Sequence, residues 1–88
     1  MTKLIIPEVL RRFCEGKTSL ELNCKNLQDF EKALQNEQVD LYDVLFEKDA
    51  LNPFVRLSIN DQLITDLSQK RAIREDDCLE LLVAVSGG

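Results

Sequence analysis

The sequence ends with the stretch CLELLVAVSGG, residues 78–88, and its part 78–85 is the most hydrophobic strand pattern in the chain. One face of this pattern holds Leu79, Leu81, Val83 and Val85. The other face holds Glu80, Leu82 and Ala84. A period of two residues is typical of a β-strand. Because strands that are covered on both sides are the most apolar, we expect this one to lie in the centre of a sheet.

A second alternating run lies upstream, at residues 54–59, with Val55, Leu57 and Ile59 on one face. Asn60-Asp61 follows, and this pair favours a tight turn into residues 62–64. Before it, Asn52-Pro53 interrupts the chain. The pattern predicts a β-hairpin with a short second arm.

The first part of the chain predicts another hairpin. Residues 3–6 are mostly aliphatic and β-branched, and residues 18–23 alternate between apolar and polar side chains. Residues 9–16 are expected to be a connection, because Gly16-Lys17 can supply the turn into the second strand.

Between the two hairpins the period changes from two to about 3.6 residues. Residues 26–36 place Leu27, Phe30 and Leu34 at three- and four-residue spacing, which predicts an amphipathic helix. Asn26 is a good N-cap, and Asp29 suits the positive end of the helix. Leu41, Val44 and Leu45 suggest a second short helical turn.

The remaining segment, residues 65–77, is polar and carries the acidic run at residues 75–77, which we expect to be a solvated loop. Strands grouped before and after one main helix indicate an α+β fold, in which the helix covers one face of a mixed sheet. We therefore divide the chain into a folded domain at residues 1–85 and a flexible tail at residues 86–88.

Composition excludes several classes of function. The chain has 88 residues and a net charge of −5, so phosphate backbones should repel it and nucleic acid is not an expected partner. It contains no histidine, the commonest general base and metal ligand, and its three cysteines have no C-x-x-C spacing. We expect no metal, no disulfide, and three reduced, partly buried cysteines. No apolar run approaches ~18 residues and no signal peptide is evident, so we expect a cytoplasmic protein away from membranes.

The tail contains two of the three glycines, Gly87 and Gly88. A frayed terminus would explain them. A functional explanation is that Ser86, Gly87 and Gly88 extend at most ~10 Å beyond the strand. A chain without Cβ atoms can enter a channel that other residues would block. With Val85 leading into it, the tail would deliver a free carboxylate into the active site of another protein, where ATP could activate it as an acyl-adenylate.

At this point the sequence resembles the ubiquitin-like sulfur carriers of the MoaD/ThiS family, which include the molybdopterin-synthase small subunit and the thiamine sulfur carrier. The resemblance covers nearly the whole chain and is most specific at residues 79–88. Residues 54–61 resemble the family's strand before an Asn-Gly or Asn-Asp turn. The opening at residues 6–11 is similar to the carriers of cysteine-type amino-acid biosynthesis.

The resemblance implies a β-grasp fold and a protein cosubstrate rather than an enzyme, with no cofactor of its own. An E1-like enzyme would adenylate the Gly88 carboxylate with ATP, a sulfur donor would replace AMP, and the thiocarboxylate would pass sulfur to an acceptor enzyme. Ser86 stands where alanine is common in the family, and Leu82 where proline often precedes the ending. These departures leave the pathway open between cysteine or a related amino acid, molybdopterin and the thiamine thiazole.

Two further classes remain open. A ubiquitin-like modifier would use the same adenylation and then join Gly88 to target lysines through an isopeptide bond. A structural adaptor would carry Gly87-Gly88 incidentally.

We also expect a docking patch beside the tail. Leu82 and Ala84 should face away from the helix, with Phe54 and Arg56 on the neighbouring strand. Singly exposed apolar residues are common, and Arg56 would either pair with an acidic group of the activating enzyme or be solvated. Cys78 is expected to be unreactive, because Asp76 and Asp77 would raise its pKa.

Overall fold

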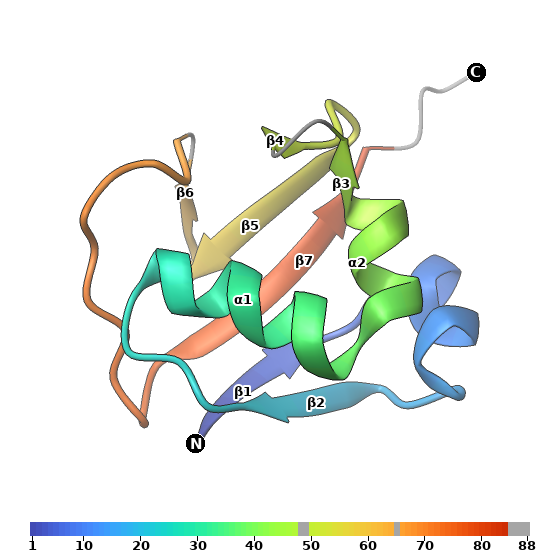
Figure 1. The fold of residues 1–88 in the computed structure, drawn as a ribbon, viewed down its shortest axis with the longest axis horizontal. Coiled ribbons are helices and arrows are strands. Elements are labelled where there is room, and N and C mark those ends of the chain that lie inside the picture. Colours follow the sequence, from blue (N-terminus) through green and yellow to red (C-terminus); the bar gives the residue numbers. More distant parts are fainter. Residues whose placement is uncertain (48–49, 65, 85–88) are drawn as a thin grey trace.

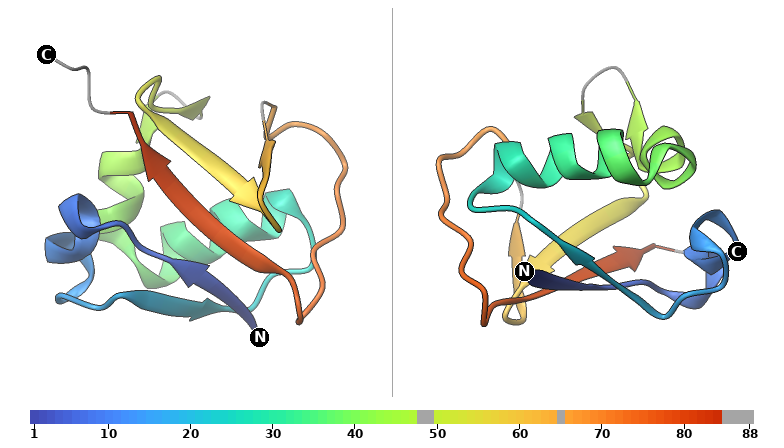
Figure 2. Two further views of the ribbon diagram at one scale, coloured as in Figure 1. Left: turned by 180° about the vertical axis from the view of Figure 1, so that it is seen from behind. Right: turned by 60° about the horizontal axis from the view of Figure 1, so that its bottom comes forward.

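The computed structural model describes residues 1–47, 50–64 and 66–84. Its five-stranded sheet has the order β2-β1-β7-β5-β6, and both α-helices lie on one face of it (Figures 1 and 2). The elements are β1 (Thr2–Ile5), the 3-10 helix η1 (Glu8–Cys14), β2 (Ser19–Leu22), α1 (Leu27–Glu37), α2 (Val39–Leu45), β3 (Phe46–Glu47), β4 (Ala50–Leu51), β5 (Val55–Ile59), β6 (Gln62–Ile64) and β7 (Cys78–Val83). The mixed α+β, β-grasp architecture is confirmed.

The central position predicted for the last strand is confirmed. β7 pairs in parallel with β1 and antiparallel with β5. Its residues Leu79 and Leu81 are fully buried beneath the helices, whereas Leu82 between Leu81 and Val83 is exposed. The alternation in the sequence therefore separates a core face from an open face of the sheet.

The first hairpin is also confirmed, since β1 and β2 pair antiparallel from Thr2↔Leu22 to Ile5↔Ser19. Its connection is more ordered than expected, because η1 forms within it and buries Leu10 and Cys14. Both side chains belong to the hydrophobic core of the domain. Gly16 has φ +77°, the left-handed conformation that favours glycine at this turn.

The main helix begins where the sequence predicted. The Asn26 side chain caps α1 by accepting a hydrogen bond of 2.8 Å from the Asp29 amide. Leu27, Phe30 and Leu34 are buried against the sheet. The expected short helical turn is a seven-residue helix, α2. The small hairpin β3–β4 was not predicted, because two residues per strand are too few to show a period.

The expectation for the cysteines is correct at two of three positions. Cys14 and Cys24 are free thiols inside the core, and burial raises the pKa of both. Cys78 is free but exposed, so the prediction of partial burial is wrong there. It lies on the same face as Leu82, because it is four residues earlier along β7, and this face is not covered by the helices.

The acidic loop also differs from the expectation. Glu75 and Asp76 are exposed, but Asp77 is partly buried and its carboxylate accepts hydrogen bonds of 2.9 Å from the Arg74 amide and from Asn60 Nδ2. Asn60 is in the predicted turn, where it and Asp61 have φ of 51° and 70°. Asp77 therefore ties the loop to the β5–β6 hairpin through hydrogen bonds that are themselves exposed.

This contact predicts a specific acid sensitivity. The hydrogen bonds from Arg74 and then Asn60 lower the pKa of Asp77 in the folded protein. A lowered pKa stabilises the fold at neutral pH, and this stabilisation is lost as the pH falls below the ordinary carboxyl value of about 4 and through the folded-state pKa. We expect Asp77→Ala to show a smaller drop in the free energy of unfolding between pH 7 and pH 3 than the wild type. Urea denaturation at the two pH values measures this drop, and Asp76→Ala is the matched control. Equal drops for Asp77→Ala and Asp76→Ala would contradict a role of Asp77 in the acid sensitivity.

Candidate functional site

The chain leaves the sheet at the end of β7, which lies next to the start of β5. Val83 pairs with Val55, and the Ala84 amide donates a hydrogen bond of 2.7 Å to the Phe54 carbonyl. This bond fixes the backbone at the last described residue. The predicted tail residues Val85, Ser86, Gly87 and Gly88 lie outside the described residues.

The structure brings together the four residues predicted for docking, which we call the exit patch: Phe54, Arg56, Leu82 and Ala84. Arg56 is the direct cross-strand partner of Leu82. Phe54 is 55% exposed and Leu82 is 38% exposed. Both are large apolar side chains at the exit, as expected for a docking surface. Their role in docking stays a prediction.

Phe54 is held by a turn rather than by the strand. The sequence placed it in a strand at residues 54–59, but β5 begins at Val55. The Asn52 side chain accepts a hydrogen bond of 2.9 Å from the Phe54 amide, and the Asn52 carbonyl accepts one of 2.9 Å from the Val55 amide. An Asx turn of this kind is a usual role for an asparagine before proline. It presents the Phe54 ring at the edge of the exit patch.

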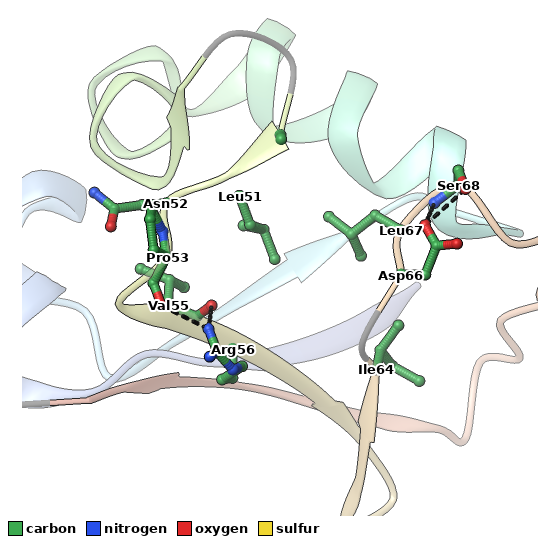
Figure 3. A pocket seen from close by; sticks show the side chains of 10 residues that line it. Leu51, Asn52, Pro53, Val55, Arg56, Ile64, Asp66, Leu67 and Ser68 are labelled. Atoms are coloured by element: carbon green, nitrogen blue, oxygen red, sulfur yellow. Dashed lines mark hydrogen bonds between the residues drawn. The ribbon is translucent and has the colours of Figure 1, made fainter.

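Arg56 is neither simply solvated nor free. Its Nη1 donates hydrogen bonds of 2.6 Å to the Pro53 carbonyl and 3.2 Å to the Val55 carbonyl (Figure 3). These bonds lay the guanidinium along the edge of β5. A guanidinium has five N–H donors, so the side chain keeps donors for an acidic group of a partner.

One exposed residue of the open sheet face was missed. Leu63 on β6 is 56% exposed and pairs across from Ser58 of β5. It faces away from the core because its neighbour Ile64 is buried. The short arm predicted at residues 62–64 contained this signal, since Leu63 must face opposite to Ile64 in a strand.

Among the described residues, no group of three or more histidine, cysteine, aspartate or glutamate side chains is placed to hold a metal ion. Within the same residues, no helix has the length and apolar character needed to cross a membrane. The exit patch lies around Ala84, the last residue that the structure describes.

The model of one protein family, the ThiS family, matches residues 4–88 of the chain. The chain belongs to the ThiS family. Its members are ubiquitin-like sulfur carriers, and the resemblance found in the sequence is confirmed. Such carriers are small protein cosubstrates rather than catalysts. The ThiS match reaches Gly88, so it includes the tail predicted to carry the sulfur.

Solved structures agree with the ThiS assignment. A chain in the Amycolatopsis orientalis BexX/CysO complex has a TM-score of 0.85 and 22% identity, with 100% of both chains covered. Mycobacterium tuberculosis CysO has a TM-score of 0.81 and 23% identity over 97% of this chain and 100% of its own. Small archaeal modifier protein 1 from Methanosarcina acetivorans has a TM-score of 0.80 and 25% identity over 99% and 95%. The search of curated proteins found no match.

Proposed function

We propose that this ThiS-family protein carries sulfur as a thiocarboxylate on Gly88. An E1-like enzyme would let the Gly88 carboxylate attack the α-phosphorus of ATP, which releases pyrophosphate and forms an acyl-adenylate. A sulfur donor would then attack the acyl carbon and expel AMP. The protein itself binds no cofactor in this cycle, and ATP belongs to the activating enzyme. We place the cycle in the cytoplasm.

The observation that carries this proposal is the family match through Gly88, the last residue of the segment that follows the central strand β7. A strand held by neighbours on both sides gives the tail a rigid base, while partner enzymes supply the reactive groups. The exit patch of Phe54, Arg56, Leu82 and Ala84 would hold the partner at that base. Ser86 and Gly87, after Val85, would pass through the partner's channel because they are small.

For the acceptor, we favour an enzyme that makes cysteine or a related amino acid. The opening at residues 6–11 supports this choice, as does the similarity in fold to two CysO structures. The complex of CysO with BexX supports the idea that such a carrier assembles with a partner enzyme. Molybdopterin synthase and thiazole synthesis are the rival acceptors within the same mechanism.

A second candidate function is protein modification through Gly88. The similarity to small archaeal modifier protein 1, at 25% identity, favours it specifically. Both functions begin with the same adenylate and differ in the nucleophile, which is a sulfur donor in one and a lysine amine in the other. Peptides from cells that express the protein, in which a lysine side chain is joined to the C-terminal stretch 75–88, would support the modifier, because Arg74 is the last site for trypsin in the chain.

The adenylation step is tested by exchange of labelled pyrophosphate into ATP. We expect exchange when the protein is mixed with ATP and its host's E1-like enzyme, and none when either protein is omitted. An enzyme that is competent with another carrier but gives no exchange with this protein would contradict the proposal.

A further inference from the structure

The open edge of β5 borders a cavity of about 510 Å³, which shares only Arg56 with the exit patch. β6 pairs with Leu57–Ile59 of β5, and on this side of β5 no strand among the described residues pairs with Val55 or Arg56. β4 and the segment 66–68 close the space from two other sides (Figure 3). Its volume is within the range of ~300–1,000 Å³ usual for binding pockets.

The cavity has an apolar floor. Val55 and Ile64 are buried there, and Leu51 and Leu67 are partly buried and point toward each other across the opening (Figure 3). A surface of this kind suits an aliphatic side chain from a partner, because burying such a side chain releases water from apolar area on both proteins.

Two opposite charges flank this floor. The Arg56 guanidinium is on one side, where its Nη1 makes both of its described hydrogen bonds and Nε and Nη2 make none among the described residues. Asp66 is on the other side, where Oδ1 accepts hydrogen bonds of 2.9 Å from the Ser68 amide and 2.6 Å from the Ser68 hydroxyl. These bonds lower the pKa of Asp66, so it is charged at neutral pH, and Oδ2 has no described partner.

The backbone edge itself cannot accept an added strand as it stands. The Val55 amide is bonded to the Asn52 carbonyl, and the Val55 carbonyl accepts from Arg56. A peptide that pairs through its main chain would first have to displace both bonds. Recognition at this cavity is therefore by side chains.

From these contacts we propose that the cavity anchors a segment of the activating enzyme that has an aliphatic side chain between a basic and an acidic residue. The basic residue would meet Asp66 Oδ2 and the acidic residue would meet the free donors of Arg56. The cavity is one strand away from the chain exit, because Val55 pairs with Val83, so an enzyme that takes Gly88 can reach both. The identity of the partner rests on the proposed function.

The test is direct binding of the full-length protein to its host's E1-like enzyme without ATP, measured by calorimetry. We expect Asp66→Lys to raise the Kd by about tenfold or more, because it places a like charge against the basic residue. Asp76→Lys, which makes the same charge change on an exposed loop, should stay within about twofold of the wild type. Leu67→Gln should also raise the Kd about tenfold, and Val39→Gln at an exposed helix position should not. Thermal unfolding checks that each variant is folded.

The inference is overturned if Asp66→Lys and Leu67→Gln bind the enzyme as their control variants do. It is also overturned if the wild-type protein does not bind the enzyme. Pyrophosphate exchange on the same proteins separates this failure from failure of the proposed function. If the wild type is adenylated and the cavity variants bind as their controls do, only the inference about the cavity is contradicted. If the wild type binds through the cavity but is not adenylated, only the proposed sulfur-carrier function is contradicted.

Discussion

A chain that ends at Gly87 is expected to lose sulfur transfer entirely while it folds as the wild type does. Removing Gly88 withdraws the reacting carboxylate by about 3.5 Å. A misplacement of only ~1 Å at a reacting centre can cost about 100-fold in rate, so no adenylate should form at a detectable level. The buried core and the described hydrogen bonds extend no further than Ala84, so the free energy of unfolding should not change measurably.

The measurement is pyrophosphate exchange together with chemical denaturation of both proteins. Ser86→Ala is the matched control, because it changes the tail without changing its length and introduces the residue that the family commonly has there. It should keep activity near that of the wild type. Pyrophosphate exchange that survives deletion of Gly88 would contradict the assignment of the Gly88 carboxylate as the reacting group.

The second prediction with a large expected effect compares Leu81 and Leu82, which are adjacent on β7. Leu81 should be needed for stability and Leu82 for docking. Leu81 is fully buried, and truncating a buried leucine to alanine costs about 2–5 kcal/mol through lost burial and the cavity left behind. Leu82 is 38% exposed on the opposite face, so Leu82→Ala should cost under about 1 kcal/mol of stability. A domain of this size has marginal stability, so Leu81→Ala should lower its melting temperature by more than about 8 °C.

For the KM of the activating enzyme, Leu82→Ala should have the larger effect of the two variants. Where both are folded, Leu82→Ala should raise the KM for the carrier about tenfold, and Leu81→Ala should leave it near the wild-type value. Denaturation curves and adenylation kinetics on the same samples provide the comparison. Equal KM values for Leu82→Ala and the wild type would remove Leu82 from the docking surface.

The sequence predicted the elements whose pattern is periodic and long. The alternation in residues 78–85 correctly placed Leu79 and Leu81 in the core, and the change of period at Asn26 correctly located the main helix. The Asn60-Asp61 turn was recognised from its residue types, because few residues adopt positive φ readily.

The errors occurred where tertiary contacts decide the structure. Neither η1 nor the hairpin β3–β4 has a periodic signature of its own, and each is defined by what it packs against. The hydrogen bond between Asn60 and Asp77 was not predicted, because the two residues are 17 apart in the sequence. The cavity depends on how β4 and the segment 66–68 lie beside β5, which no local pattern indicates.

Fragment mass spectrometry of the protein after incubation with ATP, a sulfide source and its host's E1-like enzyme tests the sulfur-carrier proposal most directly. We predict that one oxygen is replaced by sulfur at the Gly88 carboxyl group. The change must be localised to Gly88, because oxidation of Met1 or of a cysteine adds nearly the same mass. An unchanged Gly88, with an enzyme that thiolates another carrier in the same mixture, would contradict the sulfur-carrier function.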